Sequence, residues 1–153
     1  MPCRKTRQVA ATEFRYGDLT VGEAVQMTQQ HKILLIDDSE VSLHFTSLAL
    51  GRAGYEVRTT MDVHDLGAVL GGWRPDLILT DVDMPGLSGP ELCRILKSSY
   101  ETAHVPVVLF SAASSQELES LARECEADGF LSKSNGLEQL PRELGLLLES
   151  TAF

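Results

Sequence analysis

Ile33–Asp38 reads Ile-Leu-Leu-Ile-Asp-Asp, an apolar run that ends in two acids. Three later stretches repeat this pattern of a short apolar run followed by a polar residue. They are Leu77–Asp81, Val107–Ser111 and Gly129–Lys133. Such runs are typical of strands that are buried on both faces of a parallel sheet. Because ligands bind at the carboxyl edge of such a sheet, we expect the polar residues to converge there.

Expected strands and helices alternate five times from Lys32 onward. The remaining strand, the second along the chain, lies over Tyr55–Thr60, whose half-alternating pattern suits an outer strand. Helix starts are expected at Ser39, at Asp62 and at Ser114 or its neighbour, which can cap the first turns. Short links between alternating strands and helices favour one parallel sheet with helices on both faces and right-handed crossovers. The predicted fold class is therefore α/β.

The beginning of the chain lacks this alternation. Residues 1–17 are polar without a period and predict a flexible arm. Residues 18–30 allow an amphipathic helix, although Gly22 disfavours it, and a disordered leader is the alternative. We therefore expect an N-terminal extension over residues 1–31 and one domain over residues 32–153.

The composition of the 153-residue chain argues against several classes of protein. Its net charge of −9 disfavours nucleic acid as a partner, since phosphate backbones attract basic surfaces. No apolar stretch approaches the roughly 20 residues that span a bilayer, and no apolar segment follows the basic start to form a secretory signal. Three cysteines, Cys3, Cys93 and Cys125, lack metal-ligand spacing. We expect small core residues in a reducing compartment, and a cytoplasmic protein that binds neither nucleic acid nor membrane.

Three carboxylates, a hydroxyl and an ammonium are expected at one edge of the sheet. Asp37, Asp38 and Asp81 supply the oxygen ligands that Mg²⁺ takes, and a cation would relieve their repulsion. Ser111 can donate to a phosphoryl oxygen, and lysine, here Lys133, is the usual point-charge partner of phosphate. Each residue alone could be a turn former, a helix cap or a solvated surface residue. Together, in this order, they predict a site for a divalent cation and a phosphoryl group.

This combination resembles the receiver domain of bacterial two-component response regulators, over residues 32 to about 149. The resemblance implies a flavodoxin-like, doubly wound (βα)5 three-layer sandwich whose five parallel strands lie in the order 2-1-3-4-5. The residues that carry the resemblance are Asp37-Asp38, Asp81, Met84-Pro85, Gly89, Ser111-Ala112 and Lys133.

The resemblance also implies a function for the acids. Asp81 would be the phosphoacceptor, taking a phosphoryl group from a histidine kinase or a histidine phosphotransfer protein. Mg²⁺ would be the cofactor, bound by Asp37, Asp38, Asp81 and the backbone carbonyl of Asp83. The protein would not be an enzyme but a phosphoacceptor signalling protein that assists only its own phosphotransfer and dephosphorylation.

The remaining motif residues would act on the phosphoryl group and transmit its presence. Ser111 and Lys133 would contact its oxygens, and Phe130 would be a switch aromatic that turns inward when Ser111 moves. The conformational change would alter the surface of the fourth and fifth helices and the fifth strand. Since the chain ends soon after the last expected helix, we expect a stand-alone regulator whose output is a protein contact or onward phosphotransfer.

Three residues depart from the family pattern, the mildest being Ser111, where threonine is commoner. Ser134 follows the lysine where the family usually has proline, often after a cis peptide bond. A cis bond before a non-proline residue costs about 2.5–4 kcal/mol, so either the loop carries that strain or its path differs. Asp83 adds a carboxylate beside the acceptor; it either slows phosphorylation or shapes water access, or is a turn former that points to solvent.

Two other classes of protein fit the motif less well. A haloacid-dehalogenase-like phosphatase fits poorly, because its metal-binding acids follow the lysine and no aspartate follows Lys133. A flavodoxin-type cofactor binder would need a phosphate loop where the first acids lie. The alternative that stays open is a receiver-fold interaction module that works without a phosphorylation cycle.

Overall fold

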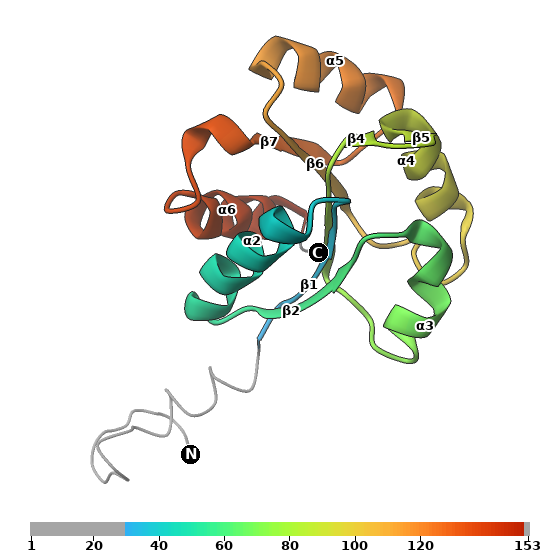
Figure 1. The fold of residues 1–153 in the computed structure, drawn as a ribbon, viewed down its shortest axis with the longest axis horizontal. Helices are drawn as coiled ribbons and strands as arrows, with labels where there is room; N and C mark the ends of the chain where they lie inside the picture. Colours follow the sequence, from blue (N-terminus) through green and yellow to red (C-terminus); the bar gives the residue numbers. More distant parts are fainter. Residues whose placement is uncertain (1–29, 152–153) are drawn as a thin grey trace, which may run out of the picture. The chain divides into compact units, whose positions relative to one another are not determined.

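The computed structural model describes residues 30–151, which contain a sheet of five parallel strands. They lie in the order β2-β1-β3-β6-β7 (Figure 1). If only these five strands are numbered along the chain, their order in the sheet is 2-1-3-4-5, which confirms the expected topology. Their bounds are β1 (Lys32–Ile36), β2 (Glu56–Thr60), β3 (Leu77–Thr80), β6 (Val107–Ser111) and β7 (Gly129–Ser132).

Two further strands, β4 (Asp83–Met84) and β5 (Leu87–Ser88), form a separate antiparallel hairpin directly after β3. Its turn is Pro85-Gly86, as the turn residues of the sequence predict. Gly86 has a φ of 76°, a conformation that side chains disfavour. The hairpin therefore fixes the path of the chain as it leaves the carboxyl end of β3.

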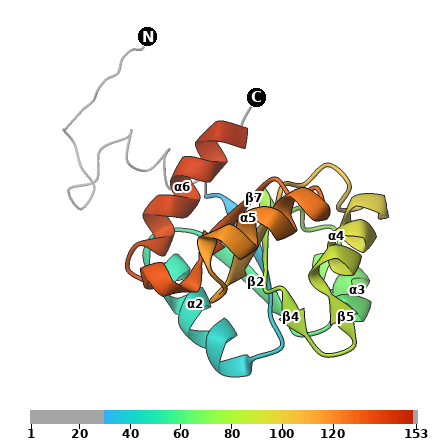
Figure 2. The same cartoon turned by 90° about the horizontal axis from the view of Figure 1, so that it is seen from above.

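Helices cover both faces of the sheet. Helices α2 and α6 pack on one face, and α3, α4 and α5 pack on the other (Figures 1 and 2). This is the three-layer (βα)5 sandwich that the sequence predicts. The helices are α2 (Glu40–Arg52), α3 (Leu66–Leu70), α4 (Gly89–Ser98), α5 (Ser115–Glu124) and α6 (Leu140–Thr151), with 3-10 turns η1 (Val63–Asp65) and η2 (Lys133–Asn135).

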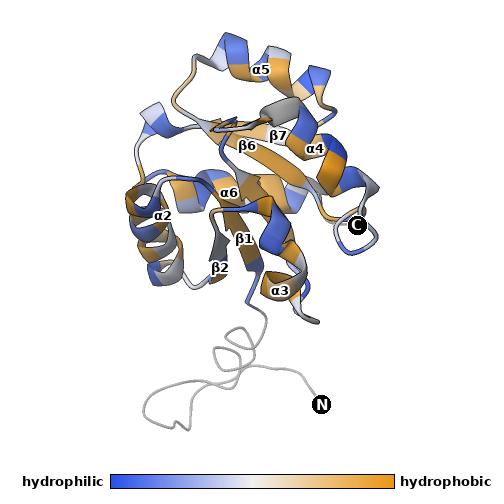
Figure 3. Ribbon diagram, turned by 45° about the vertical axis from the view of Figure 1, so that its right-hand side comes forward, coloured by the Kyte–Doolittle hydropathy of each residue, from blue (hydrophilic) through white to orange (hydrophobic). Residues whose placement is uncertain are grey.

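Alternate residues of the strands enter two hydrophobic cores. In β1, Leu34 and Ile36 join the core under α3, α4 and α5, whereas Ile33 and Leu35 join the core under α2 and α6. None of the four is more than 3% exposed. Figure 3 shows hydrophobic central strands beside helices that carry hydrophilic and hydrophobic residues in turn. Each such side chain contributes about 1.5–3 kcal/mol on burial, so the sheet is a firm support for the polar residues at its edge.

The helix starts follow the predicted capping residues in part. Ser39 caps α2, with its hydroxyl accepting the backbone N–H of Ser42 at 3.2 Å. Ser114 caps α5 in a capping box with Glu117. Asp62 caps the 3-10 turn η1 instead of an α-helix, and α3 follows as a helix of only five residues. The single helix expected after Asp62 is therefore divided.

The cysteines of the described region are core residues, as expected. Cys93 of α4 and Cys125 at the end of α5 are both buried in the same core and both free. Burial, together with the neighbouring thiol of Cys125, raises the pKa of the Cys93 thiol to about 12. A thiol with so high a pKa is unreactive, which is consistent with a packing role.

The predicted helix over residues 18–30 and the arm before it lie outside the described residues, apart from residue 30. Within residues 30–151, no helix has the length and apolar character needed to cross a membrane. The cytoplasmic location stays a prediction.

Candidate functional site

The carboxyl ends of β1 and β3 lie side by side. The pairing of Ile36 with Thr80 brings the next residues, Asp37 and Asp81, to the same level of the sheet. The ladder continues past the strands, because the amide of Asp81 donates to the carbonyl of Ile36 at 2.8 Å. On the other side of β1, the amide of Asp37 donates to the carbonyl of Thr60 at 3.2 Å. Backbone register alone therefore brings the two acids together.

Asp37, Asp38 and Asp81 form one carboxylate cluster. Each offers an oxygen that lies within 4.8 Å of the oxygens of the other two. The side chains of Asp37 and Asp81 are only 8% and 11% exposed, and Asp38 is the most exposed of the three. Magnesium holds oxygens at about 2.0–2.1 Å, so its opposite ligands lie about 4.2 Å apart. The three oxygens lie close enough together to converge on one such cation, and carboxylate oxygens are donors of the right kind.

Lys133 brings a positive charge to this cluster from the end of β7. Its ammonium is 3.0 Å from Asp37 Oδ2 and 3.9 Å from Asp81 Oδ1. It also donates to the Ser42 hydroxyl at 3.3 Å and lies 5.4 Å from the centre of the Phe110 ring. The predicted acids and the predicted lysine are thus brought together, with the lysine nearer to Asp37 than to Asp81.

The path of the chain after Lys133 decides between a strained cis bond before Ser134 and a different loop path. All peptide bonds within residues 30–151 are trans, including the bond between Lys133 and Ser134. The chain turns instead into η2, where the hydroxyl of Ser132 accepts the amide N–H of Ser134 at 3.1 Å. A different loop path, with no cis bond, delivers the lysine to the acids.

Asp37 and Asp81 have pKa values that are shifted in opposite directions. Burial alone raises the pKa of Asp37, but the amide of Ser39, the Lys133 ammonium and the Ser42 hydroxyl together hold it below the usual value. Burial also raises the pKa of Asp81, and the negative charge of Asp37 adds to this. Attraction to Lys133 and backbone hydrogen bonds to its carboxylate do not compensate, so the pKa of Asp81 stays raised.

Ser111 and Phe130 lie on the neighbouring strands β6 and β7. Ser111 is 2% exposed, and its hydroxyl oxygen accepts the amide N–H of Ala113 at 3.2 Å. Its O–H is a separate donor that can serve a ligand oxygen at the sheet edge. Phe130 pairs with Leu109 across the sheet and is half-buried against the core of α4 and α5. The ring therefore packs against the core on one side and stays accessible on the other.

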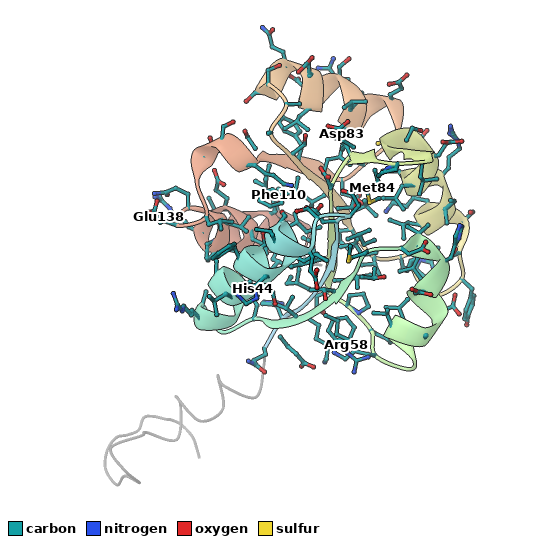
Figure 4. The ribbon with its side chains drawn as sticks, in the orientation of Figure 1. His44, Arg58, Asp83, Met84, Phe110 and Glu138 are labelled. Atoms are coloured by element: carbon teal, nitrogen blue, oxygen red, sulfur yellow. The ribbon has the colours of Figure 1, made fainter. Side chains whose placement is uncertain are left out.

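Asp83 lies in β4 and faces away from the core. Its side chain is exposed, and its backbone N–H partly offsets the raised pKa of the Asp81 carboxyl. Together with Glu117 and Glu124 of α5 it lines an open groove of about 450 Å³. Figure 4 shows Asp83 on the side of α5, and Phe110 on the side of α2 and α6. The metal-binding role of the Asp83 backbone carbonyl stays a prediction.

Two residues that contact the lysine were not singled out from the sequence. Ser42 lies in the first turn of α2, and Phe110 precedes Ser111 at the end of β6. A signal for Ser42 was present, because a helix that begins directly after the acid pair presents its first turn at the same sheet edge. No comparable pattern marks Phe110, whose aromatic side chain reads as an ordinary core residue.

The fold and this cluster define a class of protein. The model of the response regulator receiver domain family matches residues 33–144. The chain belongs to this family.

Characterised relatives are similar over this same region. Response regulator PleD of Caulobacter vibrioides is 38% identical over 102 residues, which are 67% of this chain and 22% of PleD. The phosphate regulon transcriptional regulatory protein PhoB of Pseudomonas aeruginosa is 32% identical over 119 residues, 78% of this chain and 52% of PhoB. The chain thus spans about a fifth to a half of the length of these relatives.

Solved structures agree with the fold. The chemotaxis response regulator CheY4 of Vibrio cholerae superimposes with a TM-score of 0.68 at 28% identity, covering 78% of this chain and 99% of CheY4. A putative response regulator from Chloroflexus aurantiacus gives a TM-score of 0.69 at 25% identity, covering 79% of this chain and 99% of its own.

Proposed function

We propose that the protein works in a two-component or phosphorelay pathway, by accepting a phosphoryl group on Asp81 from a histidine kinase or a histidine phosphotransfer protein. Family membership supports the signalling class, and the relatives named response regulators support the pathway type. The observation that carries the proposal is the convergence of three carboxylates with the Lys133 ammonium at one edge of the sheet.

The transfer exchanges one bond of phosphorus for another. An oxygen of the ionised Asp81 carboxylate attacks phosphorus, the bond from phosphorus to the imidazole nitrogen of the donor breaks, and the imidazole takes up a proton. The product is an acyl phosphate on Asp81. Lys133 and Ser111 would hold the oxygens of the transferring group, since ammonium and hydroxyl donors suit its negative charge.

Asp37, Asp38 and Asp81 would hold Mg²⁺, joined by the backbone carbonyl of Asp83. When bound, this cation supplies positive charge that stabilises the transferring phosphoryl group. The cluster already contains one ammonium against three carboxylates, so it retains an excess of negative charge that favours a divalent cation.

Phosphorylation would then change the surface of α5, β7 and α6. A phosphoryl group on Asp81 would draw the Ser111 hydroxyl toward it, and Phe130 would turn into the space that this loop leaves. The half-buried position of Phe130 supports this movement, because the ring can lose its exposed side without leaving the core. The acyl phosphate would thus bias two pre-existing arrangements of the loop.

A receiver-fold interaction module without a phosphate cycle is less well supported. The clearest departure from the family pattern was Ser134, and η2 delivers Lys133 to Asp37 in spite of it. A module that only binds partners would have no need for three convergent carboxylates with an ammonium.

Labelling of the purified full chain tests the proposal. The protein is incubated with Mg²⁺ and acetyl phosphate, the bound phosphate is counted from the mass of the intact chain, and the acceptor is located by mass spectrometry after borohydride reduces the acyl phosphate to homoserine. We expect one phosphate, on Asp81, and none in Asp81→Asn. The matched control is Asp83→Asn, which removes a carboxylate from the same loop and should still be labelled.

Undiminished labelling of Asp81→Asn would reject the acceptor. If the unchanged chain takes no label from acetyl phosphate or phosphoramidate, the result would favour the interaction module.

A further inference from the structure

Ser42 contacts the ammonium of the site. Its hydroxyl accepts an N–H of the Lys133 ammonium at 3.3 Å, and the same ammonium pairs with Asp37 Oδ2 at 3.0 Å. We propose that Ser42 is a positioning residue that holds the Lys133 ammonium in place for the phosphoryl group on Asp81. The inference rests on the proposed phosphoacceptor function and concerns the preparation of that same site.

The geometry leaves one N–H of the ammonium for the acceptor. An ammonium has three donors, and two of them are taken by Asp37 Oδ2 at 3.0 Å and by the Ser42 hydroxyl at 3.3 Å. The ring of Phe110, 5.4 Å away, closes a further side. Asp81 Oδ1 lies at 3.9 Å, too far for a hydrogen bond but close enough for an oxygen of a phosphoryl group on Asp81 to enter that range.

Asp37 alone would hold the ammonium loosely. Lysine has a flexible four-carbon stem, and the side chain of Lys133 is 26% exposed, so solvent and Asp81 compete for it. A single ion pair permits rotation about one contact. The Ser42 hydroxyl adds a second acceptor at 3.3 Å, so the ammonium is held from two directions.

Ser42 is itself held in position by the start of α2. Its backbone N–H donates to the hydroxyl of the capping residue Ser39 at 3.2 Å, and the amide of Ser39 donates to Asp37 Oδ1 at 2.9 Å. The cap thus ties the first turn of the helix to one oxygen of Asp37, while Lys133 binds the other oxygen. The hydroxyl of Ser42 is therefore carried by a rigid element and not by a mobile loop.

Removal of the hydroxyl should free the ammonium. In Ser42→Ala, Lys133 keeps only one close contact and can swing to Asp81, where it pairs with the attacking carboxylate. Loss of one hydrogen bond to a charged group should slow phosphorylation by acetyl phosphate at saturating Mg²⁺ by about tenfold. Ser42→Thr keeps the hydroxyl and should stay within about twofold of the original rate.

The matched control is Ser47→Ala, because Ser47 lies on the same helix, is likewise half-buried, and lines the groove between α2 and β2 instead of the site. It should label at the original rate. A second measurement follows the ammonium itself by nitrogen-15 NMR of the metal-free protein, with Lys133→Met used to assign the signal. The hydrogen-bonded ammonium should exchange its protons slowly, and Ser42→Ala should broaden or lose the signal, whereas Ser42→Thr and Ser47→Ala should keep it.

Equal labelling rates in Ser42→Ala and the unchanged protein would overturn the inference, and so would a threonine variant as slow as the alanine variant. If no variant and no unchanged protein takes label, the proposed function fails. In that case the ammonium signal still decides the positioning role: its loss only in Ser42→Ala supports the role, and identical spectra refute it.

Discussion

The loops after β1 and after β3 carry acids at the same level of the sheet, yet they hold them differently. Asp37, after β1, has the amide of Ser39 at 2.9 Å on one oxygen and Lys133 at 3.0 Å on the other. Asp81, after β3, receives the amide of Val82 at 2.9 Å, but Lys133 stays 3.9 Å away.

Burial raises the pKa of both acids, and only the donors around Asp37 reverse the effect. The two acids at this sheet edge therefore differ. The charge of Asp37 is balanced by close donors, whereas the charge of Asp81 is not and is available to a cation or a phosphoryl group.

The largest expected effect comes from substitution of Asp37. Asp37→Asn removes a proposed metal ligand and the close partner of Lys133, and we expect labelling by acetyl phosphate with Mg²⁺ to slow by about a hundredfold. Initial rates at matched Mg²⁺ measure this. The exposed Asp65→Asn, on η1 away from the cluster, is the control and should label at the original rate. A rate within twofold of the original for Asp37→Asn would mean that the two loops do not act together.

Magnesium should require both loops. At a concentration about a hundred times its Kd, a ligand that binds only the folded protein adds about 2.7 kcal/mol to the free energy of unfolding. We expect a rise in melting temperature with millimolar MgCl₂ for the unchanged chain, and little rise for Asp37→Asn, Asp38→Asn and Asp81→Asn. Matched NaCl of equal ionic strength controls for screening. If the cation leaves the melting temperature unchanged, the cluster is not a metal site.

Without metal, neutralising the two acids should change stability in opposite directions. Asp81→Asn removes a buried charge that Asp37 repels, and should raise the free energy of unfolding at neutral pH by about 1 kcal/mol. Asp37→Asn deprives Lys133 of its close partner and should lower it by about 2 kcal/mol. Denaturant unfolding with a chelator present measures both. A loss of stability in both variants would contradict the contrast between the loops.

The same contrast predicts opposite pH dependences. The pKa of Asp37 is held below 3.8, so the stability from its ionised form is complete above that value and is lost as the pH falls through the lowered pKa. The pKa of Asp81 is raised above 3.8, so the stability from its protonated form is present below 3.8 and is lost as the pH rises through the raised pKa.

Unfolding curves measured over a pH series test this. The increase in the free energy of unfolding caused by Asp81→Asn should grow above pH 3.8, and the decrease caused by Asp37→Asn should shrink below pH 3.8. Parallel pH profiles for the two variants would show that the two pKa values do not differ in the predicted way.

The smallest expected effect belongs to Asp83, a further charge on the loop after β3. Because the side chain is exposed, its repulsion of an anionic donor is screened. We expect Asp83→Asn to speed labelling by acetyl phosphate about two- to fivefold at low salt, and less at high salt. Ser88→Ala, which changes the paired residue of the hairpin without changing charge, is the control. Equal rates across a salt series would make Asp83 a turn residue only.

The sequence alone predicted the parts of the fold that depend on local patterns. Three of the apolar runs became the inner strands β1, β3 and β6, and the fourth became the edge strand β7. Ser39 and Ser114 became caps, because first-turn hydrogen bonds involve neighbours in the chain. The helix after Asp62 was predicted less well. Asp62 closes a tight 3-10 turn there, and Gly67 weakens the short helix that follows.

What only the tertiary structure decided are the distances on which the chemistry depends. The contact of Lys133 with Ser42 joins residues 91 positions apart, and no local pattern encodes it. The path through Ser134 and the opposite pKa shifts of Asp37 and Asp81 likewise depend on where one side chain from β7 comes to rest between two loops. The sequence determined which polar groups meet at the sheet edge, because parallel strands deliver their carboxyl ends together. Packing determined which carboxylate the lysine neutralises, because an ammonium acts only over a few ångströms.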